Sequence, residues 1–155
     1  MRRRPRVDWH DERGQFAGIE AIPFSILVFV VGSLLVANAW AVVDAKFVVT
    51  SAAREAARTY VEASDLSTGR LRAEEAAASV VVNHGRSTER FTLDWEPELP
   101  PLSRCARVTA RAQYDVPAIT LPFIGGYGNA FEVTSTHSEI VDPFRDGLDP
   151  VGGCG

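Results

Sequence analysis

Residues 21–43 read AIPFSILVFVVGSLLVANAWAVV, and this uncharged stretch decides the fold of the chain. It lies between Glu20 and Asp44. A helix of this length extends about 35 Å, which is enough to cross a hydrocarbon core of about 30 Å. Core helices of soluble domains rarely stay apolar on every face for so many turns. The stretch therefore predicts a transmembrane helix.

The residues on either side of this helix predict its orientation. Before it the chain carries five arginines, Arg2, Arg3, Arg4, Arg6 and Arg13, whereas Asp44 and Lys46 follow it. Because basic residues are retained on the cytoplasmic side, we expect a cytoplasmic N-terminus and an extracytoplasmic C-terminal domain. Asn38 is the only strongly polar side chain in the span. We expect it either to contact another transmembrane helix or to be hydrated near the outer face.

Length and charge limit the remaining possibilities. The 155 residues suffice for one anchor and one small domain. Residues 44–155 carry 11 Lys and Arg against 16 Asp and Glu, an acidic balance that argues against nucleic acid as a partner. The two cysteines, Cys105 and Cys154, both fall on the predicted outer side, where oxidation is permitted. We expect an intramolecular disulfide, with separate thiols or a link between chains as alternatives.

The helical pattern continues beyond the predicted span. One face between Asp44 and Ala63 carries small and apolar residues at helical spacing: Val49, Ala52, Ala53, Ala56, Tyr60 and Ala63. Arg58 and Glu62 stand four residues apart and can form an ion pair. We therefore expect one continuous helix over about residues 18–64, partly in lipid and partly in water.

A second helix is expected from about Thr68 to His84. Residues 65–69 would break the first helix, Ser67 or Thr68 would cap the second, and Gly85 would end it. Its expected buried face consists of Leu71, Ala77, Val80, Val81 and His84.

Alternation with period two then indicates strands over residues 91–95 and 104–116, and a third strand is expected over residues 131–140, bounded by Asn129 and Pro143. The expected fold is α+β and pilin-like: a long N-terminal transmembrane helix, a second helix and a small antiparallel sheet of three or four strands. We expect a basic cytoplasmic segment (1–17), the long helix (18–64), an extracytoplasmic domain (65–146) and a flexible tail (147–155). The whole stretch after Asp142 contains several Pro and Gly and could be held only by Cys154.

The loop after Val116 is unusually apolar. Its large side chains are Ile119, Leu121, Phe123, Ile124 and Tyr127. Such a loop either packs on its own sheet or meets the membrane surface or a partner subunit, because soluble surfaces seldom expose so much contiguous apolar area. Prolines 117 and 122 remove backbone donors and disfavour strand addition.

No catalytic constellation is recognisable. The glycines of residues 125–128 lack the βαβ context of a phosphate-binding loop. His137, Ser138 and Glu139 are neighbours on a strand and must point to alternating faces. No Cys and His spacing suits zinc. We therefore expect no enzymatic activity, cofactor, metal or small-molecule substrate.

Several short motifs carry a resemblance to a known family. They are RGQFAGIE (13–20) before the apolar run, AAREAAR (52–58), CARVT (105–109), VPAITLP (116–122) and THSEIVDPFR (136–145). Together they resemble TadE-like (TadE/TadG) minor pseudopilins of the tight-adherence (Flp) pilus assembly system, of the actinobacterial type. The resemblance implies a single-pass structural component of a pilus or secretion machine, which contacts other subunits through its transmembrane helix.

The resemblance also draws attention to a processing site. Family members have Glu at the fifth position after the cleaved glycine, whereas here five residues separate Gly14 from Glu20; cleavage after Gln15 would restore the spacing. Glu20 could pair with a free amine of a neighbouring subunit or be solvated by headgroup water. The alternative function is a secreted small binding domain released by signal-peptide cleavage after Ala39, within the sequence Ala37-Asn-Ala39.

Overall fold

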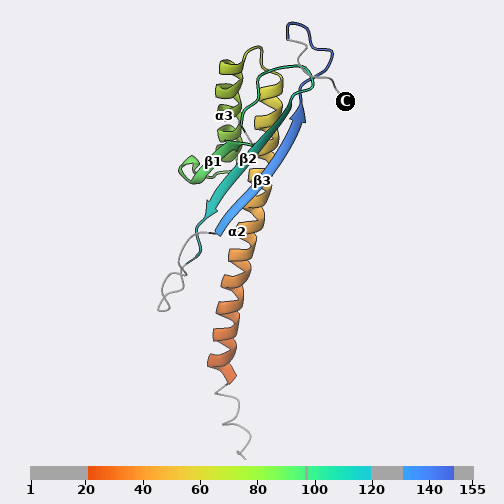
Figure 1. Ribbon diagram of the computed structural model, residues 1–155. Helices are drawn as coiled ribbons and strands as arrows, with labels where there is room; N and C mark the ends of the chain where they lie inside the picture. The colour runs from red at the N-terminus through yellow and green to blue at the C-terminus, as the bar shows by residue number, and fades with distance from the viewer. Residues whose placement is uncertain (1–20, 97, 120–130, 149–155) are drawn as a thin grey trace, which may run out of the picture. The chain divides into compact units, whose positions relative to one another are not determined.

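The computed structural model describes residues 21–96, 98–119 and 131–148, and it has the expected α+β fold (Figure 1). The elements in chain order are α2 (Ala21–Val61), α3 (Leu66–Asn83), the short 3-10 helix η2 (Thr88–Arg90), β1 (Phe91–Trp95), β2 (Arg107–Val116) and β3 (Phe131–Ile140). The three strands form one antiparallel sheet in the order β1-β2-β3. The chain divides into two units, one up to Ala37 and one from Asn38 onward.

The described part of the first unit is the apolar beginning of α2. Among the described residues, α2 is the one helix long and apolar enough to cross a membrane, and none of its most apolar window is buried. The core helix of a soluble domain would be covered by other elements. The helix therefore suggests a single-pass membrane protein.

The second unit has a core made largely of small side chains. All six residues of the predicted stripe are buried, five of them on α2 and Ala63 just after its end, which confirms that stripe. Buried alanines of α3 and β2 belong to the same cluster: Ala73, Ala77, Ala110 and Ala112. Because alanine side chains are short, the helices and the sheet can approach closely. Figure 1 shows α3 lying alongside the later part of α2.

The ends of α2 and α3 differ from the expected ones. α2 ends at Val61, three residues before Ser64, and α3 begins at Leu66, two residues before Thr68. Asp65 is the N-cap of α3, not Ser67 or Thr68. Its Oδ1 accepts hydrogen bonds from the Thr68 backbone N–H and the Ser67 hydroxyl, each at 2.8 Å. A carboxylate also suits the positive end of the helix dipole, which favours Asp65 over the two hydroxyls.

The buried face of α3 also differs from the expected one. It consists of Gly69, Ala73, Ala77 and Val81 at four-residue spacing, while Leu71 is exposed. Gly69 lies inside the helix because the packing leaves no room for a side chain: an added Cβ would lie 2.7 Å from the Cβ of Ala63. The end of α3 agrees with the prediction, since Gly85 follows it with a φ of +69°.

The cap of α3 gives a pH-dependent prediction. The Thr68 backbone N–H, followed by the hydroxyls of Thr68 and Ser67, lowers the pKa of Asp65 to about 2. A depressed folded-state pKa contributes stability that is present above the ordinary pKa of about 4 and is lost as the pH falls towards 2. We expect Asp65→Asn to melt below the native chain at pH 6. The gap in Tm should close between about pH 4 and pH 2; a constant gap would contradict the prediction.

The strands follow the expected alternation closely. β1 and β3 have the predicted bounds, whereas β2 begins at Arg107 and not at Arg104. The preceding backbone turns at Cys105, whose φ is +65°, and therefore cannot continue the strand. In the register of the β2–β3 pair, Arg107 is opposite Ile140 and Val116 is opposite Phe131.

Candidate functional site

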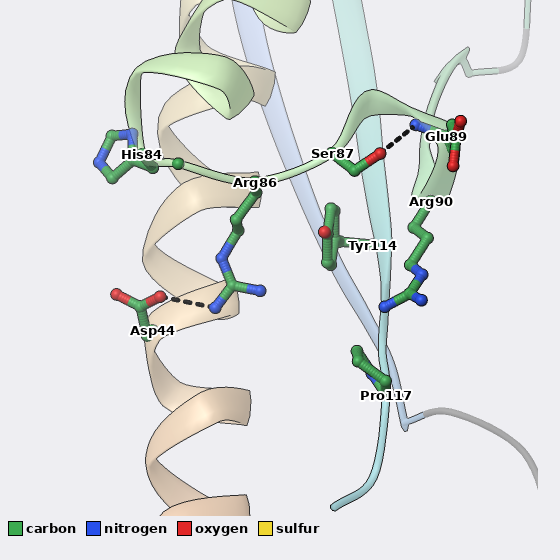
Figure 2. A pocket seen from close by; sticks show the side chains of 9 residues that line it. Asp44, His84, Arg86, Ser87, Glu89, Arg90, Tyr114 and Pro117 are labelled. Atoms are coloured by element: carbon green, nitrogen blue, oxygen red, sulfur yellow. Dashed lines mark hydrogen bonds and ion pairs between the residues drawn. The ribbon is translucent and has the colours of Figure 1, made fainter.

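A polar cavity lies beside Asp44, the first charged residue after the uncharged stretch of α2 (Figure 2). It has a volume of about 490 Å³ and lies between α2, β2 and the connection that follows α3. Its lining residues are Asp44, His84, Gly85, Arg86, Ser87, Glu89, Arg90, Tyr114 and Pro117.

Arg86 is the central side chain of this cavity. Figure 2 shows its guanidinium between Asp44 on α2 and Tyr114 on β2. Its Nη2 donates to Asp44 Oδ2 at 2.6 Å and to the carbonyl of Ala41 at 3.3 Å. Its Cζ lies 5.1 Å from the centroid of the Tyr114 ring, within the range of a cation–π contact. The side chain is only 15% exposed, so the ion pair is less screened than a surface pair.

These contacts join parts of the chain that are distant in sequence. Arg86 follows the end of α3, which the positive φ of Gly85 brings back towards α2. The guanidinium thus contacts both α2 and β2, while the Arg86 backbone belongs to the α3–η2 connection. One side chain therefore joins these three segments. The Ser87 hydroxyl at the edge of the cavity accepts a hydrogen bond from the Glu89 backbone N–H at 3.3 Å. The arrangement around Arg86 suits a structural lock between these segments.

Two further contacts lie on the same part of α2. The Oδ1 of Asn38 accepts a hydrogen bond from the backbone N–H of Ile119 at 2.9 Å. The Lys46 ammonium donates to the carbonyl of Thr134 on β3. Asn38 thus has a partner within its own chain, in the segment that follows β2, whereas the sequence suggested another helix or headgroup water.

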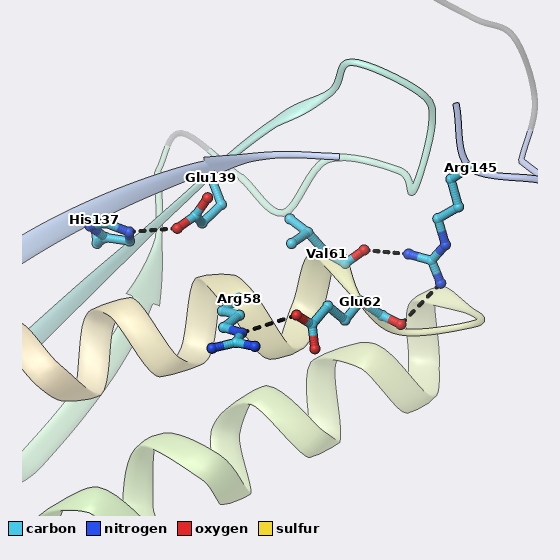
Figure 3. Close-up of polar contacts among 6 residues, drawn as sticks. All are labelled: Arg58, Val61, Glu62, His137, Glu139 and Arg145. Atoms are coloured by element: carbon cyan, nitrogen blue, oxygen red, sulfur yellow. Dashed lines mark hydrogen bonds and ion pairs between the residues drawn. The ribbon is translucent and has the colours of Figure 1, made fainter. Parts of the chain in front are cut away.

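Possible catalytic groups on β3 do not combine into a triad. His137 Nε2 lies 2.8 Å from Glu139 Oε1, as Figure 3 shows. The Ser138 hydroxyl points to the other face, where its Oγ lies 2.8 Å from Oγ1 of Thr109. The alternation predicted from the sequence is therefore confirmed. Within residues 21–96, 98–119 and 131–148, no group of three His, Cys, Asp or Glu could hold a metal ion.

The segment after β3 is held in a way that the sequence did not predict. The Arg145 guanidinium donates to the backbone carbonyls of Val61, Glu62 and Ala63 at the end of α2, two of which Figure 3 draws. Arg104 Nε donates in turn to the Arg145 carbonyl at 2.9 Å. The expectation that only Cys154 could hold the stretch after Asp142 is therefore wrong, because the charged side chain of Arg145 in that stretch binds carbonyls at the C-terminal end of a helix.

The structure describes only some of the other site residues that the sequence predicts. Ile119 is 44% exposed, and the Cys105 backbone N–H donates to the Val141 carbonyl at 3.0 Å. The others lie outside the described residues: Gly14, Gln15, Glu20, Leu121, Phe123, Ile124, Tyr127 and Cys154. The pairing of Cys105 with Cys154 therefore stays a prediction.

Sequence reasoning missed the two arginines that fix this unit. Arg86 and Asp44 are 42 residues apart, and Arg145 and Val61 are 84 apart, so no local periodicity connects them. The one available signal for Arg86 was its position directly after the glycine that ends α3.

Comparisons with protein-family models, curated proteins and solved structures found no match to this chain.

Proposed function

We propose that this chain is a membrane-anchored structural subunit of the TadE-like minor pseudopilin kind, acting in a tight-adherence pilus or secretion assembly. It would bind other subunits through its transmembrane helix and carry no enzymatic activity. The motifs of residues 13–20 and 136–145 are the basis for the family, and the arginines before Ala21 are the basis for a cytoplasmic N-terminus. The disulfide between Cys105 and Cys154 belongs to the same proposal.

The observation that carries the proposal is the two-part character of α2. The helix runs without interruption from Ala21 to Val61. Its side chains are exposed or half-exposed up to Trp40, whereas from Ala45 onward one face is buried in the core of the second unit. A helix with an uncovered apolar part and a packed amphipathic part suits a subunit that is anchored in lipid and presents a folded domain in water.

The contacts beside Asp44 also suit this role. Asp44 and Lys46 are both bonded to other elements of the second unit. These bonds hold the folded unit to the helix directly after the uncharged stretch.

Membrane anchoring is tested by fractionating cells that express the full chain. We expect it to stay in the membrane fraction after carbonate extraction, because about 20 apolar residues insert effectively irreversibly. Protease added from outside should degrade the part beyond residue 44. Replacing Val30 and Leu34 by Arg should release the chain, since each charge at a helix centre costs about 2.5–3.5 kcal/mol.

A soluble species beginning at Trp40 would instead establish the secreted alternative. Such cleavage would remove Asn38 and its hydrogen bond to Ile119. The pilus role is tested separately in the native host. Deleting the gene should abolish pilus assembly while the transcripts of neighbouring assembly genes persist, and complementation should restore it. Normal pili in the deletion strain would refute the role without affecting the anchor.

A further inference from the structure

One end of the β2–β3 hairpin lies beside the uncharged stretch of α2. Val116 and Phe131 are the last residue of β2 and the first of β3, and they are opposite each other in the register. Three residues further along the chain, the backbone N–H of Ile119 donates to Asn38 Oδ1 at 2.9 Å. Asn38 precedes Asp44 by six residues, which is about 9 Å along a helix axis. The hairpin end therefore lies at the level of the uncharged stretch.

We propose that this hairpin end rests in the outer face of the lipid bilayer, next to α2, as a second contact with the membrane. The membrane-facing end is defined as Val116, Pro117, Ala118, Ile119 and Phe131. The proposal rests on the membrane anchoring proposed above. The new element is that the folded unit contacts the lipid directly, in addition to its covalent link to the transmembrane helix.

The chemistry of the membrane-facing end suits this environment. None of its five residues is charged, and its two large apolar side chains, Ile119 and Phe131, are 44% and 48% exposed. Trp40 and Phe47 on α2 are exposed aromatic residues on either side of Asp44. Aromatic side chains favour the boundary between hydrocarbon and headgroups. These exposed apolar side chains all belong to the same unit as Asn38.

Two of the backbone positions at this end leave no unpaired N–H group. An unsatisfied N–H group is costly where water is scarce. Pro117 has no N–H group, and Asn38 accepts the N–H of Ile119. The one strongly polar side chain of the span therefore has a specific use, which is to satisfy a backbone donor next to lipid.

Charged residues limit how deeply the hairpin end can enter. The next pair in the register, Asp115 and Glu132, is exposed and acidic on both strands. The Asp44–Arg86 ion pair and the charge of Lys46 also lie beyond the C-terminal end of the uncharged stretch. Carboxylates are costly in hydrocarbon. The contact is therefore shallow, reaching about 5–10 Å into the headgroup and acyl boundary, as interfacial segments do.

The test uses the full chain in phosphatidylcholine vesicles whose lipids are brominated at acyl carbons 6 and 7, which quench tryptophan near the interface. Trp9 and Trp40 are replaced by Phe, so that Trp95 is the only native tryptophan left. A tryptophan is then introduced by Phe131→Trp or, as the matched control, by Ile140→Trp. Ile140 is similarly exposed at 53% and lies at the opposite end of β3.

We expect at least roughly twofold stronger quenching for Phe131→Trp than for Ile140→Trp, because only the first side chain lies at the interface. Ile119→Trp should behave like Phe131→Trp, and it provides a second reading if one variant folds poorly by circular dichroism. Equal quenching of both ends, or none at either, would overturn the proposal. A third outcome would also overturn the proposal, namely weak quenching of Phe131→Trp at a high protein-to-lipid ratio that becomes strong as the ratio is lowered. A second copy of the chain, and not lipid, would then cover position 131 at the high ratio.

Vesicle flotation separates this proposal from the anchoring on which it rests. A chain that fails to float with the vesicles would refute the anchor. A chain that floats without selective quenching at position 131 would refute the hairpin contact alone. Asn38→Leu should reduce the quenching of Phe131→Trp while flotation is unchanged, because the bond that holds the segment after β2 against α2 is lost.

Discussion

Tyr60→Ala is expected to lower the free energy of unfolding by about 3–5 kcal/mol, the range for removing a large aromatic side chain from a core. Tyr60 is the largest fully buried side chain among the described residues. Its ring lies 5.3 Å from that of Trp95, and its δ and ε carbons border Gly69 of α3. Truncation therefore opens a cavity at the junction of both helices and the sheet. Denaturant unfolding of the full chain in detergent, followed by Trp95 fluorescence, measures the loss.

Tyr60→Phe separates the ring from its hydroxyl. The hydroxyl donates to the Pro100 carbonyl at 2.6 Å, and burial raises the pKa of Tyr60, which keeps this donor protonated. Its removal should cost about 1 kcal/mol. Ser51→Ala, on an exposed part of the same helix, should change stability by less than about 0.5 kcal/mol. A Tyr60→Ala chain as stable as Ser51→Ala would contradict the assigned core.

The parts of this fold that sequence predicts are those governed by local periodicity. The alanine stripe of α2 is buried as expected because its 3.6-residue spacing leaves one face for packing. β2 agrees from Arg107 onward because every second residue, from Val108 to Val116, is buried as the period-two alternation predicts. In both elements each residue's environment follows from its near neighbours, so no knowledge of the rest of the chain is needed.

The start of α3 shows where local reasoning fails. Ser64, Asp65, Ser67 and Thr68 are all residue types that cap helices, and local sequence does not choose among them. Glycine disfavours helices, so local sequence places Gly69 in the break. In the structure Gly69 lies inside α3, where Ala63 and Tyr60 occupy the space of a side chain. The need for glycine at this position therefore comes from packing, which local sequence does not reveal.

The candidate site was less predictable than the fold. Arg86 meets Asp44, and Ile119 meets Asn38, across 42 and 81 residues respectively. Such pairs depend on how the sheet is placed against α2, which periodicity does not specify. The sequence did identify Asn38 as the one strongly polar residue of the span and Ile119 as part of an unusually apolar loop. It gave no reason to connect the two.

Arg145→Ala is expected to lower the free energy of unfolding by about 1.5–3 kcal/mol, the range for hydrogen bonds that involve a charged group. The guanidinium donates to three carbonyls at the end of α2, which have no acceptor role within the helix. Its positive charge also lies at the negative end of the helix dipole. Without it these carbonyls lose their partners, and residues 142–148 lose their attachment to α2.

Arg145→Lys tests whether charge alone explains the effect. Lysine keeps the charge but lacks the planar fork of donors, so it should recover only part of the lost stability. Arg107→Ala, at an exposed position of β2, is the matched control for removing an arginine and should have little effect. Hydrogen exchange should show faster exchange in the last turn of α2 for Arg145→Ala and not for Arg107→Ala. If exchange and unfolding in Arg145→Ala match those of Arg107→Ala, the Arg145 bonds contribute nothing to stability, and Cys154 again becomes the expected attachment of the tail.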